Sequence, residues 1–244
     1  IPTKKNRKQV ENALEFSTKM HHGQTRKSGL PFVSHCIDVA NILIDWNMDH
    51  TTVVSALLHD IVEDTEVKLS DIEEEFGSDV ALLVDGVTKV ENIAFRSKKH
   101  KQAENFTKLF LSLARDLRVI IIKFADRLNN METIQYLSSK KRKEIALETK
   151  EIFVPLAHRL GMAQLKWKLE DLSLKCLDLR AFNDIKKKIE TSSRLNEDIL
   201  SNAIKPIKSE LNTYKIKSNI FGRYKSISSI QRKIEKSGKK FEEI

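Results

Sequence analysis

A short run in the first third of the chain sets a histidine beside three carboxylates. Residues 59–64 read His-Asp-Ile-Val-Glu-Asp. On one continuous helix the side chains of His59, Asp60, Glu63 and Asp64 fall at about 0°, 100°, 40° and 140°, and so share a face. This face suits a divalent metal ion held by His59 and Asp60, with Glu63 and Asp64 one turn further on to handle water.

Two residues far from this run are candidates for the same ion. His35 begins a predicted helix, and Asp126 follows the strongly apolar run 119–122. A carboxylate in such an apolar helix needs a partner, because an unpaired buried charge is very costly. A salt bridge to an arginine such as Arg127 would explain Asp126 as well as metal ligation does. His35 on its own is more simply an ordinary core or surface histidine.

The elements that must position these residues are predicted to be helices. The chain has only 7 Gly and 4 Pro in 244 residues, so turns are scarce, and apolar residues recur at spacings of three and four. An all-α fold follows. The predicted helices lie near 6–21, 34–47, 50–63, 69–76, 78–90, 102–114, 116–136, 140–158, 162–178 and 181–213.

The pattern divides the chain into three parts. A compact helical domain is predicted for residues 1–178, a helical linker for 179–213, and the start of a second domain for 214–244. The boundary at residue 214 rests on a change in the hydrophobic pattern, because apolar and polar residues alternate over 214–221 as in a short β-strand.

Composition and charge limit the classes of function. The net charge is +9, and residues 181–244 carry 15 Lys/Arg against 8 Asp/Glu. We interpret this basic stretch as a solvated helical face rather than a nucleic-acid surface. No apolar run has transmembrane length. Cys36 and Cys176 are too few for a disulfide framework, so a cytoplasmic protein is expected.

The order His35, His59-Asp60, Asp126 matches the metal ligands of the HD phosphohydrolase superfamily. Further motifs narrow the resemblance to the RelA/SpoT homologues, bifunctional enzymes that make and degrade the alarmone (p)ppGpp. The motifs that carry it lie at 22–29, 56–65, 86–89, 103–106 and 155–161. The resemblance covers essentially the entire chain. It implies an HD-domain helical bundle, then a helical linker and the first elements of an α/β synthetase domain.

The resemblance also implies a reaction. The family hydrolyses ppGpp or pppGpp at the 3′ position and releases pyrophosphate with GDP or GTP. Mn²⁺ would be held by His35, His59, Asp60 and Asp126, and would polarise the 3′-phosphate. Glu63 and Asp64 would orient and deprotonate the attacking water.

Substrate contacts are implied for a loop and for one helix face. In the family the loop at Arg26, Lys27 and Ser28 grips the nucleotide, with the arginine packed on the guanine. Asn130 and Thr133 fall at about 40° and −20° from Asp126, so they share its stripe on a helix, and by resemblance they contact the nucleoside. From sequence alone, a Lys/Arg pair beside a glycine turn is usually solvated, and both polar residues could be ordinary exposed positions.

The chain departs from the family pattern beside the expected site. It has Asn129 and Glu132 where the family usually has His and Arg, and 29–32 lacks the usual acid and tyrosine. Because the expected ligands and the Glu63/Asp64 pair are retained, we expect hydrolysis to survive.

The end of the chain resembles the entry to the synthetase domain. There, Arg223 and Lys225 correspond to residues that bind the ATP donor's phosphates. The acidic strand that carries the transfer would follow Ile244, so we expect no synthesis by this chain. The expected partners are the nucleotide and the regulatory domains of a longer parent chain, without nucleic acid or membrane.

Two other functions stay open. The chain could be an HD phosphohydrolase of another nucleotide, such as a dNTP or a cyclic dinucleotide. It could also be a nucleotide-binding regulatory HD domain with little turnover.

Overall fold

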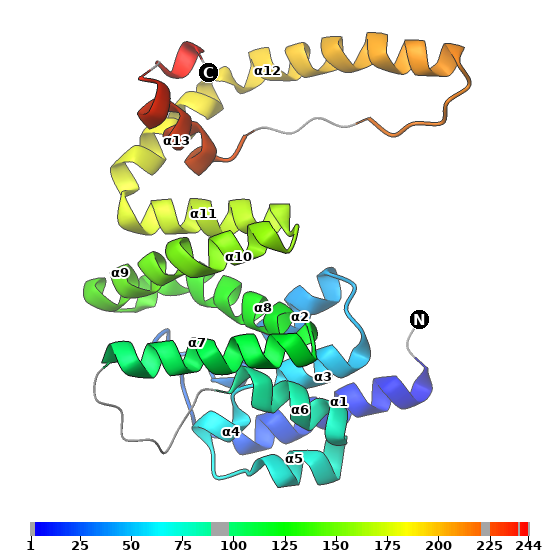
Figure 1. Ribbon diagram of the computed structural model, residues 1–244, viewed down its shortest axis with the longest axis vertical. Helices are drawn as coiled ribbons and strands as arrows, with labels where there is room; N and C mark the ends of the chain where they lie inside the picture. The colour runs from blue at the N-terminus through cyan, green and yellow to red at the C-terminus, as the bar shows by residue number, and fades with distance from the viewer. Residues whose placement is uncertain (1–2, 89–97, 221–224, 239, 244) are drawn as a thin grey trace. The chain divides into compact units, whose positions relative to one another are not determined.

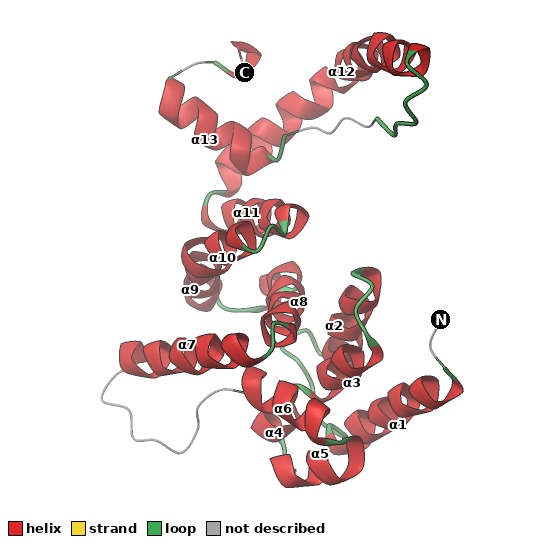
Figure 2. Cartoon of the chain, turned by 45° about the vertical axis from the view of Figure 1, so that its right-hand side comes forward, coloured by secondary structure: helices red, strands yellow, loops and turns green. Residues whose placement is uncertain are grey.

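The computed structural model describes residues 3–88, 98–220, 225–238 and 240–243 (Figure 1). These residues form helices joined by short loops, and no β-strand occurs among them (Figure 2). The only bridge in the described part is an isolated antiparallel one between Thr25 and Pro31. The all-α prediction is therefore confirmed. The chain divides into two compact units, Ile1–Leu137 and Ser138–Ile244.

The first unit contains every residue predicted for the hydrolase site. Its core forms where α2 packs on α3 and α8, and where α3 packs on α1 and α6. Leu43, Leu58, Ile120 and Phe124 are completely buried there. The elements are α1 (Lys4–Met20), α2 (Val33–Asp45), α3 (His50–Leu58), α4 (Ile61–Asp64), α5 (Leu69–Phe76), α6 (Ser78–Val87), α7 (Lys98–Arg115), α8 (Arg118–Glu132) and the 3₁₀ turn η1 (Ile134–Tyr136).

The second unit is also helical. Its α11 packs on α9, α10 and α12, and α13 packs on α11 and α12. Asp171 of α11 accepts hydrogen bonds from the backbone N–H groups of Ile227 and Ser228, and so caps the first turn of α13. The elements are α9 (Ser139–Glu148), the π-helical turn η2 (Thr149–Phe153), α10 (Val154–Arg159), α11 (Ala163–Leu177), α12 (Leu179–Thr213), α13 (Ile227–Ser237) and η3 (Phe241–Glu243).

The helix predicted for 50–63 is two helices. α3 ends at Leu58 and α4 begins at Ile61, with His59 and Asp60 in the turn between them. Asp60 has φ −99° and ψ −4°, which takes it out of regular helical geometry. The prediction that four polar side chains share one face of a continuous helix was therefore wrong. The turn brings His59 and Asp60 to the site in another way.

Three other predicted elements differ from the structure. The helix predicted for 116–136 ends at Glu132, and after Thr133 the 3₁₀ turn η1 begins at Ile134. The helix predicted for 140–158 widens into a π-helical turn at 149–153, just before Pro155, which has no N–H to donate. The strand predicted for 214–221 is absent from its described residues, 214–220. A strand needs a partner for its backbone groups, and the described residues supply none.

The start of α8 is fixed by charged side chains. Asp116 accepts a hydrogen bond from the Arg118 backbone N–H at 2.8 Å, and the Arg118 guanidinium folds back onto the same carboxylate. Arg118 also reaches Asp49, whose carboxylate caps α3 by accepting from the Thr52 backbone N–H. These contacts tie together the starts of the two helices that lead to the predicted metal ligands.

Two negative predictions can be compared with the structure. Across the described part of the chain, no helix has both the length and the apolar character needed to cross a bilayer. Cys36 and Cys176 are both free thiols.

Candidate metal centre

The predicted metal ligands from three separate segments meet in the first unit. His35 lies in α2, His59 and Asp60 in the α3–α4 turn, and Asp126 in α8. One ligand atom from each of His35, His59 and Asp126 can be chosen so that all three lie within 4.8 Å of one another. Asp60 Oδ2 lies 3.5 Å from His35 Nε2 and 3.2 Å from His59 Nε2. All four side chains therefore face one point.

Hydrogen bonds on the far side of each ring orient both histidines. His59 Nδ1 lies 2.7 Å from the Ala56 carbonyl oxygen, which can only accept, so Nδ1 carries the proton. His35 Nδ1 donates at 2.7 Å to the side-chain oxygen of Asn129. When neutral, each ring therefore turns the lone pair of its Nε2 toward the carboxylates. Metal-binding histidines are commonly held in this way.

The electrostatics of the cluster favour a cation. Burial opposes protonation of His59, but the Asp60 and Asp126 carboxylates raise its pKa to about 9. Burial also opposes ionisation of the two aspartates, yet His59 lowers the pKa of Asp60, and Lys123 holds the pKa of Asp126 well below its usual range. The two aspartates are thus buried anions that neighbouring positive charge compensates.

The residues present fit a divalent metal ion. His59 Nε2 is completely buried and makes no hydrogen bond, although Asp60 Oδ2 is 3.2 Å away. A buried polar atom without a hydrogen bond calls for an explanation, and an ion shared by imidazole nitrogens and carboxylate oxygens provides one.

Lys123 is a member of the site that the sequence analysis missed. Its Nζ lies 2.8 Å from Asp126 Oδ2, and its side chain is only 14% exposed. Burial lowers the pKa of Lys123, but Asp126, Asp60 and Glu63 together raise it. The salt bridge considered for Asp126 therefore exists, but with Lys123 at i−3. The spacing Lys-x-x-Asp on one helix was the signal available in the sequence.

The nucleotide loop predicted at 26–28 is a closed turn. The Arg26 N–H donates to the Leu30 carbonyl, the Gly29 N–H donates to the Arg26 carbonyl, and Gly29 has φ +85°. The Arg26 guanidinium reaches α8, where it donates to the side-chain oxygens of Asn129 at 3.0 Å and Asn130 at 2.8 Å. Lys27 is exposed and Ser28 half-buried.

Asn130 and Thr133 both lie at the end of α8. The Asn130 side-chain NH₂ donates to Asp126 Oδ1. Thr133 is half-buried, and its hydroxyl donates to the Asn129 carbonyl at 2.9 Å. Asn130 therefore touches a predicted metal ligand directly, whereas Thr133 closes the helix end.

Glu63 and Asp64 are placed differently from each other. Glu63 is half-buried, and its charge acts on Lys123. Asp64 is exposed, and its main-chain carbonyl accepts a 2.7 Å hydrogen bond from Gln24. An open hollow of about 530 Å³ lies beside Asp64 and Gln24. Gln24 thus fixes the end of α4, a role that its residue type and spacing did not predict.

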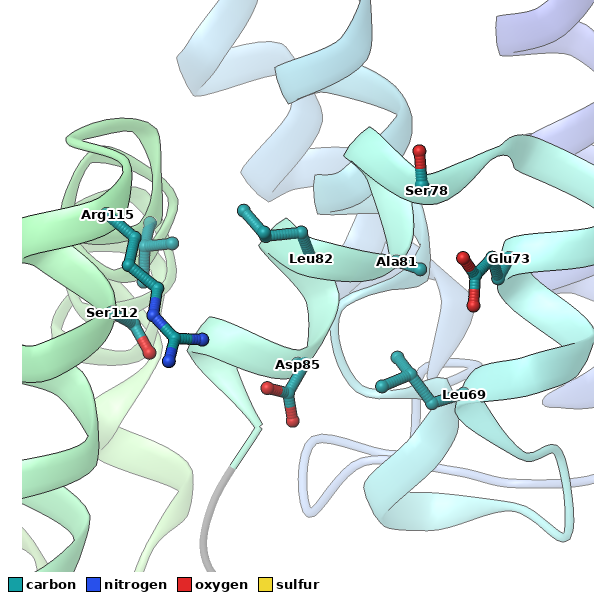
Figure 3. Close-up of a pocket in the computed structure, with 9 residues that line it drawn as sticks. Leu69, Glu73, Ser78, Ala81, Leu82, Asp85, Ser112 and Arg115 are labelled. Carbon is teal, nitrogen blue, oxygen red and sulfur yellow. The ribbon is translucent and has the colours of Figure 1, made fainter.

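A second hollow, of about 270 Å³, lies away from the predicted ligands (Figure 3). It is lined by α5, α6, α7 and the start of α8, with Ser112 and Arg115 on one side and Leu69 and Glu73 on the other. None of the predicted site residues lines it.

The residues predicted for ATP binding cannot be compared in the same way. Arg223 lies outside the described residues, and Lys225 is exposed, just before α13.

Comparison with known proteins identifies the class that this fold and site define. The HD domain family matches residues 13–163, more than half of the chain and all of the predicted metal ligands. The chain belongs to the HD domain family.

The relatives narrow the class further. The chain is 40% identical over 238 residues to a guanosine-3′,5′-bis(diphosphate) 3′-pyrophosphohydrolase of Spiroplasma citri, covering 97% of this chain and 32% of that protein. It is 39% identical over 237 residues to the bifunctional (p)ppGpp synthase/hydrolase SpoT of Escherichia coli K12, covering 97% and 34%. The chain spans about a third of the length of these curated relatives. The resemblance to RelA/SpoT homologues is confirmed.

A solved structure is similar as well. It is a metazoan ortholog of SpoT that hydrolyses ppGpp, with a TM-score of 0.53 and 26% sequence identity. The match covers 70% of this chain and 95% of the other. The prediction of an HD-type helical fold is thereby confirmed.

Proposed function

We propose that this chain hydrolyses the 3′-pyrophosphate of ppGpp and pppGpp, releasing pyrophosphate and GDP or GTP. The observation that carries the proposal is the buried meeting of His35, His59 and Asp126 within 4.8 Å, with Asp60 beside them. The 39–40% identity to a 3′-pyrophosphohydrolase and to SpoT supports the choice of substrate.

The proposed metal site consists of His35, His59, Asp60 and Asp126, and the proposed ion is Mn²⁺. Two imidazoles and two carboxylates form a ligand set that suits this ion. When bound, the ion would supply Lewis-acid polarisation of the 3′-phosphate. The hydrogen bonds from the two Nδ1 atoms would keep the lone pairs of both rings directed at it.

The remaining roles fall to the chain's own side chains. Glu63 and Asp64 are proposed to orient the attacking water and take its proton. The role of Glu63 is supported by its electrostatic interaction with Lys123, which places its charge near the metal site. The role of Asp64 is supported by the hollow beside it. The proposed nucleotide-binding residues of the loop are Arg26, Lys27 and Ser28. The nucleoside is proposed to contact Asn130 and Thr133 as well.

The proposed organisation of the chain keeps the boundaries predicted from sequence. Residues 1–178 would form the hydrolase domain, 179–213 the linker, and 214–244 the start of the synthetase domain, with Arg223 and Lys225 in its ATP site. The single helix α12 over Leu179–Thr213 supports the linker. Cytosolic location and contacts with regulatory domains belong to this proposal.

One assay tests the function. Purified protein is incubated with Mn²⁺ and ppGpp, and the products are resolved by anion exchange. We expect GDP and pyrophosphate from the wild type, none from Asp60→Ala, and a wild-type yield from Asp45→Ala, which removes an exposed carboxylate at the end of α2. Tight ppGpp binding without GDP would point to a regulatory domain instead. Turnover of dNTPs but not of ppGpp would point to another phosphohydrolase.

A further inference from the structure

The Arg26 guanidinium makes a fork between the nucleotide loop and α8. One arm, Nη1, donates to Asn129 Oδ1 at 3.0 Å, and the other, Nη2, donates to Asn130 Oδ1 at 2.8 Å. Each of these amides also contacts a predicted metal ligand. The loop expected to read the nucleotide is therefore two hydrogen bonds away from the metal centre by two separate routes.

The first route runs through Asn129, which is 4% exposed. Its Oδ1 accepts from both Arg26 and His35 Nδ1, while its NH₂ donates to Asp38 Oδ2 at 3.3 Å. Two donors on the oxygen and a carboxylate at the nitrogen leave only one orientation for the amide. In that orientation Asn129 selects the His35 tautomer that turns Nε2 toward Asp60 and Asp126.

The second route runs through Asn130. Its NH₂ donates to Asp126 Oδ1, and its Oδ1 accepts from Arg26. The remaining oxygen of Asp126 pairs with Lys123. Arg26 is thus connected to Asp126 through Asn130, in addition to its connection to His35 through Asn129.

We propose that Arg26 is a positioning residue for the metal centre, acting through Asn129 and Asn130 on His35 and Asp126. The proposal rests on the proposed function only for the identity of the metal site, and it assigns to Arg26 a task that exists without nucleotide. The planar guanidinium, which donates to two acceptors in a fixed geometry, is suited to this task, and a lysine ammonium is not.

Loss of the Arg26 charge and loss of its positioning role change Mn²⁺ affinity in opposite directions, which makes the proposal testable. Arg26 carries a positive charge near a site that binds a cation, so its charge alone weakens metal binding. Removing that charge would strengthen Mn²⁺ binding if Arg26 served only the nucleotide. Removing a residue that orients two ligands would weaken it.

The experiment titrates nucleotide-free, metal-free protein with Mn²⁺ and follows free Mn²⁺ by electron paramagnetic resonance. We expect Arg26→Met and Arg26→Lys to weaken binding about tenfold, the lower end of what loss of a ligand-orienting partner causes. Arg26→Lys matters most because it keeps the charge and loses the fork. Lys27→Met, which removes a neighbouring exposed charge from the same loop, should leave the affinity equal or slightly higher.

A double-mutant cycle shows whether Arg26 acts through the amide. Asn129→Leu should weaken Mn²⁺ binding by a similar factor, and Arg26→Met combined with Asn129→Leu by less than the product of the two factors. Thermal unfolding of each metal-free variant separates loss of positioning from loss of folding. Equal or tighter Mn²⁺ binding by a folded Arg26→Lys overturns the proposal. Wild type that binds Mn²⁺ but releases no GDP from ppGpp overturns the proposed function instead.

Discussion

Single residues decide how far this site keeps the family's chemistry. Asn129 replaces the histidine that is usual in RelA/SpoT homologues. In the structure Asn129 is buried and hydrogen-bonded to His35, Arg26 and Asp38. The substitution therefore leaves a connected polar network rather than a gap.

The Glu63 and Asp64 carboxylates should separate catalysis from metal binding. We expect Glu63→Gln with Asp64→Asn to lower kcat at least a hundredfold, as loss of general base catalysis does, because neither amide can take a proton from water. Mn²⁺ affinity should change only slightly, since neither residue is a proposed ligand. Steady-state kinetics with ppGpp and a Mn²⁺ titration measure the two effects. An unchanged rate would refute the assignment; Glu74→Gln, on the exposed side of α5, is the control.

Lys123 should contribute most to the stability of the fold when no ion is bound. Lys123→Met leaves the Asp126 carboxylate buried without its cation, so we expect the metal-free free energy of unfolding to fall by about 3 kcal/mol. Saturating Mn²⁺ should shrink this deficit, because the ion compensates the same carboxylate. Urea unfolding with Mn²⁺ and with EDTA gives both values. Lys108→Met, which breaks the more exposed pair with Asp85, is the control. Equal deficits of Lys123→Met with Mn²⁺ and with EDTA would contradict the prediction.

At the scale of elements, helices were predictable and their interruptions were not. Apolar spacing identified the segments, but the same spacing continues through His59 and Asp60, so the turn between α3 and α4 gave no signal. The proposed ligands of the site could be chosen by residue type and order along the chain. Asn129 became visible only when α2, α8 and the loop at Arg26 came together, because its contacts span these elements. The spacing of Lys123 and Asp126 on one helix could be read from the sequence, but the burial of Lys123 could not.

The start of α8 should give the fold a defined acid sensitivity. Hydrogen bonds from Arg118 lower the pKa of Asp116. Burial raises the pKa of Asp49, but the hydrogen bonds that it accepts from the Thr52 hydroxyl and backbone N–H, together with the Arg118 charge, lower it overall. Because both folded-state pKa values are depressed, the stabilisation is present above the unfolded pKa of about 3.9 and is lost as pH falls through the folded values.

A substitution tests this sensitivity. Arg118→Met should cost about 1 kcal/mol at pH 7, and the difference from wild type should vanish in strong acid, where both carboxyls are protonated in either protein. Urea unfolding across pH 2–7 measures it. Arg7→Met removes the more exposed pair with Glu11 and should do little at any pH; a constant Arg118 deficit down to pH 2 would contradict the linkage.

At the scale of the whole molecule, all proposed ligands lie in one of the two compact units. Mn²⁺ at a hundredfold excess over its Kd should therefore stabilise that unit by about 2.7 kcal/mol. We expect slower amide hydrogen exchange in Ile1–Leu137, especially in α2 and α8, and little change in Ser138–Ile244. EDTA should reverse the effect and Asp60→Ala should abolish it. Equal protection of both units would contradict a site confined to the first.

The two ring hydrogen bonds described above have a spectroscopic consequence. The Nδ1 protons of His35 and His59 are bonded inside the protein, and the two side chains are 2% and 1% exposed. Such protons leave slowly for solvent, so each should give its own signal far downfield in a proton NMR spectrum. A paramagnetic ion would erase both signals and a diamagnetic one would only move them. The site thus contains its own pair of probes, which need no label and no substrate.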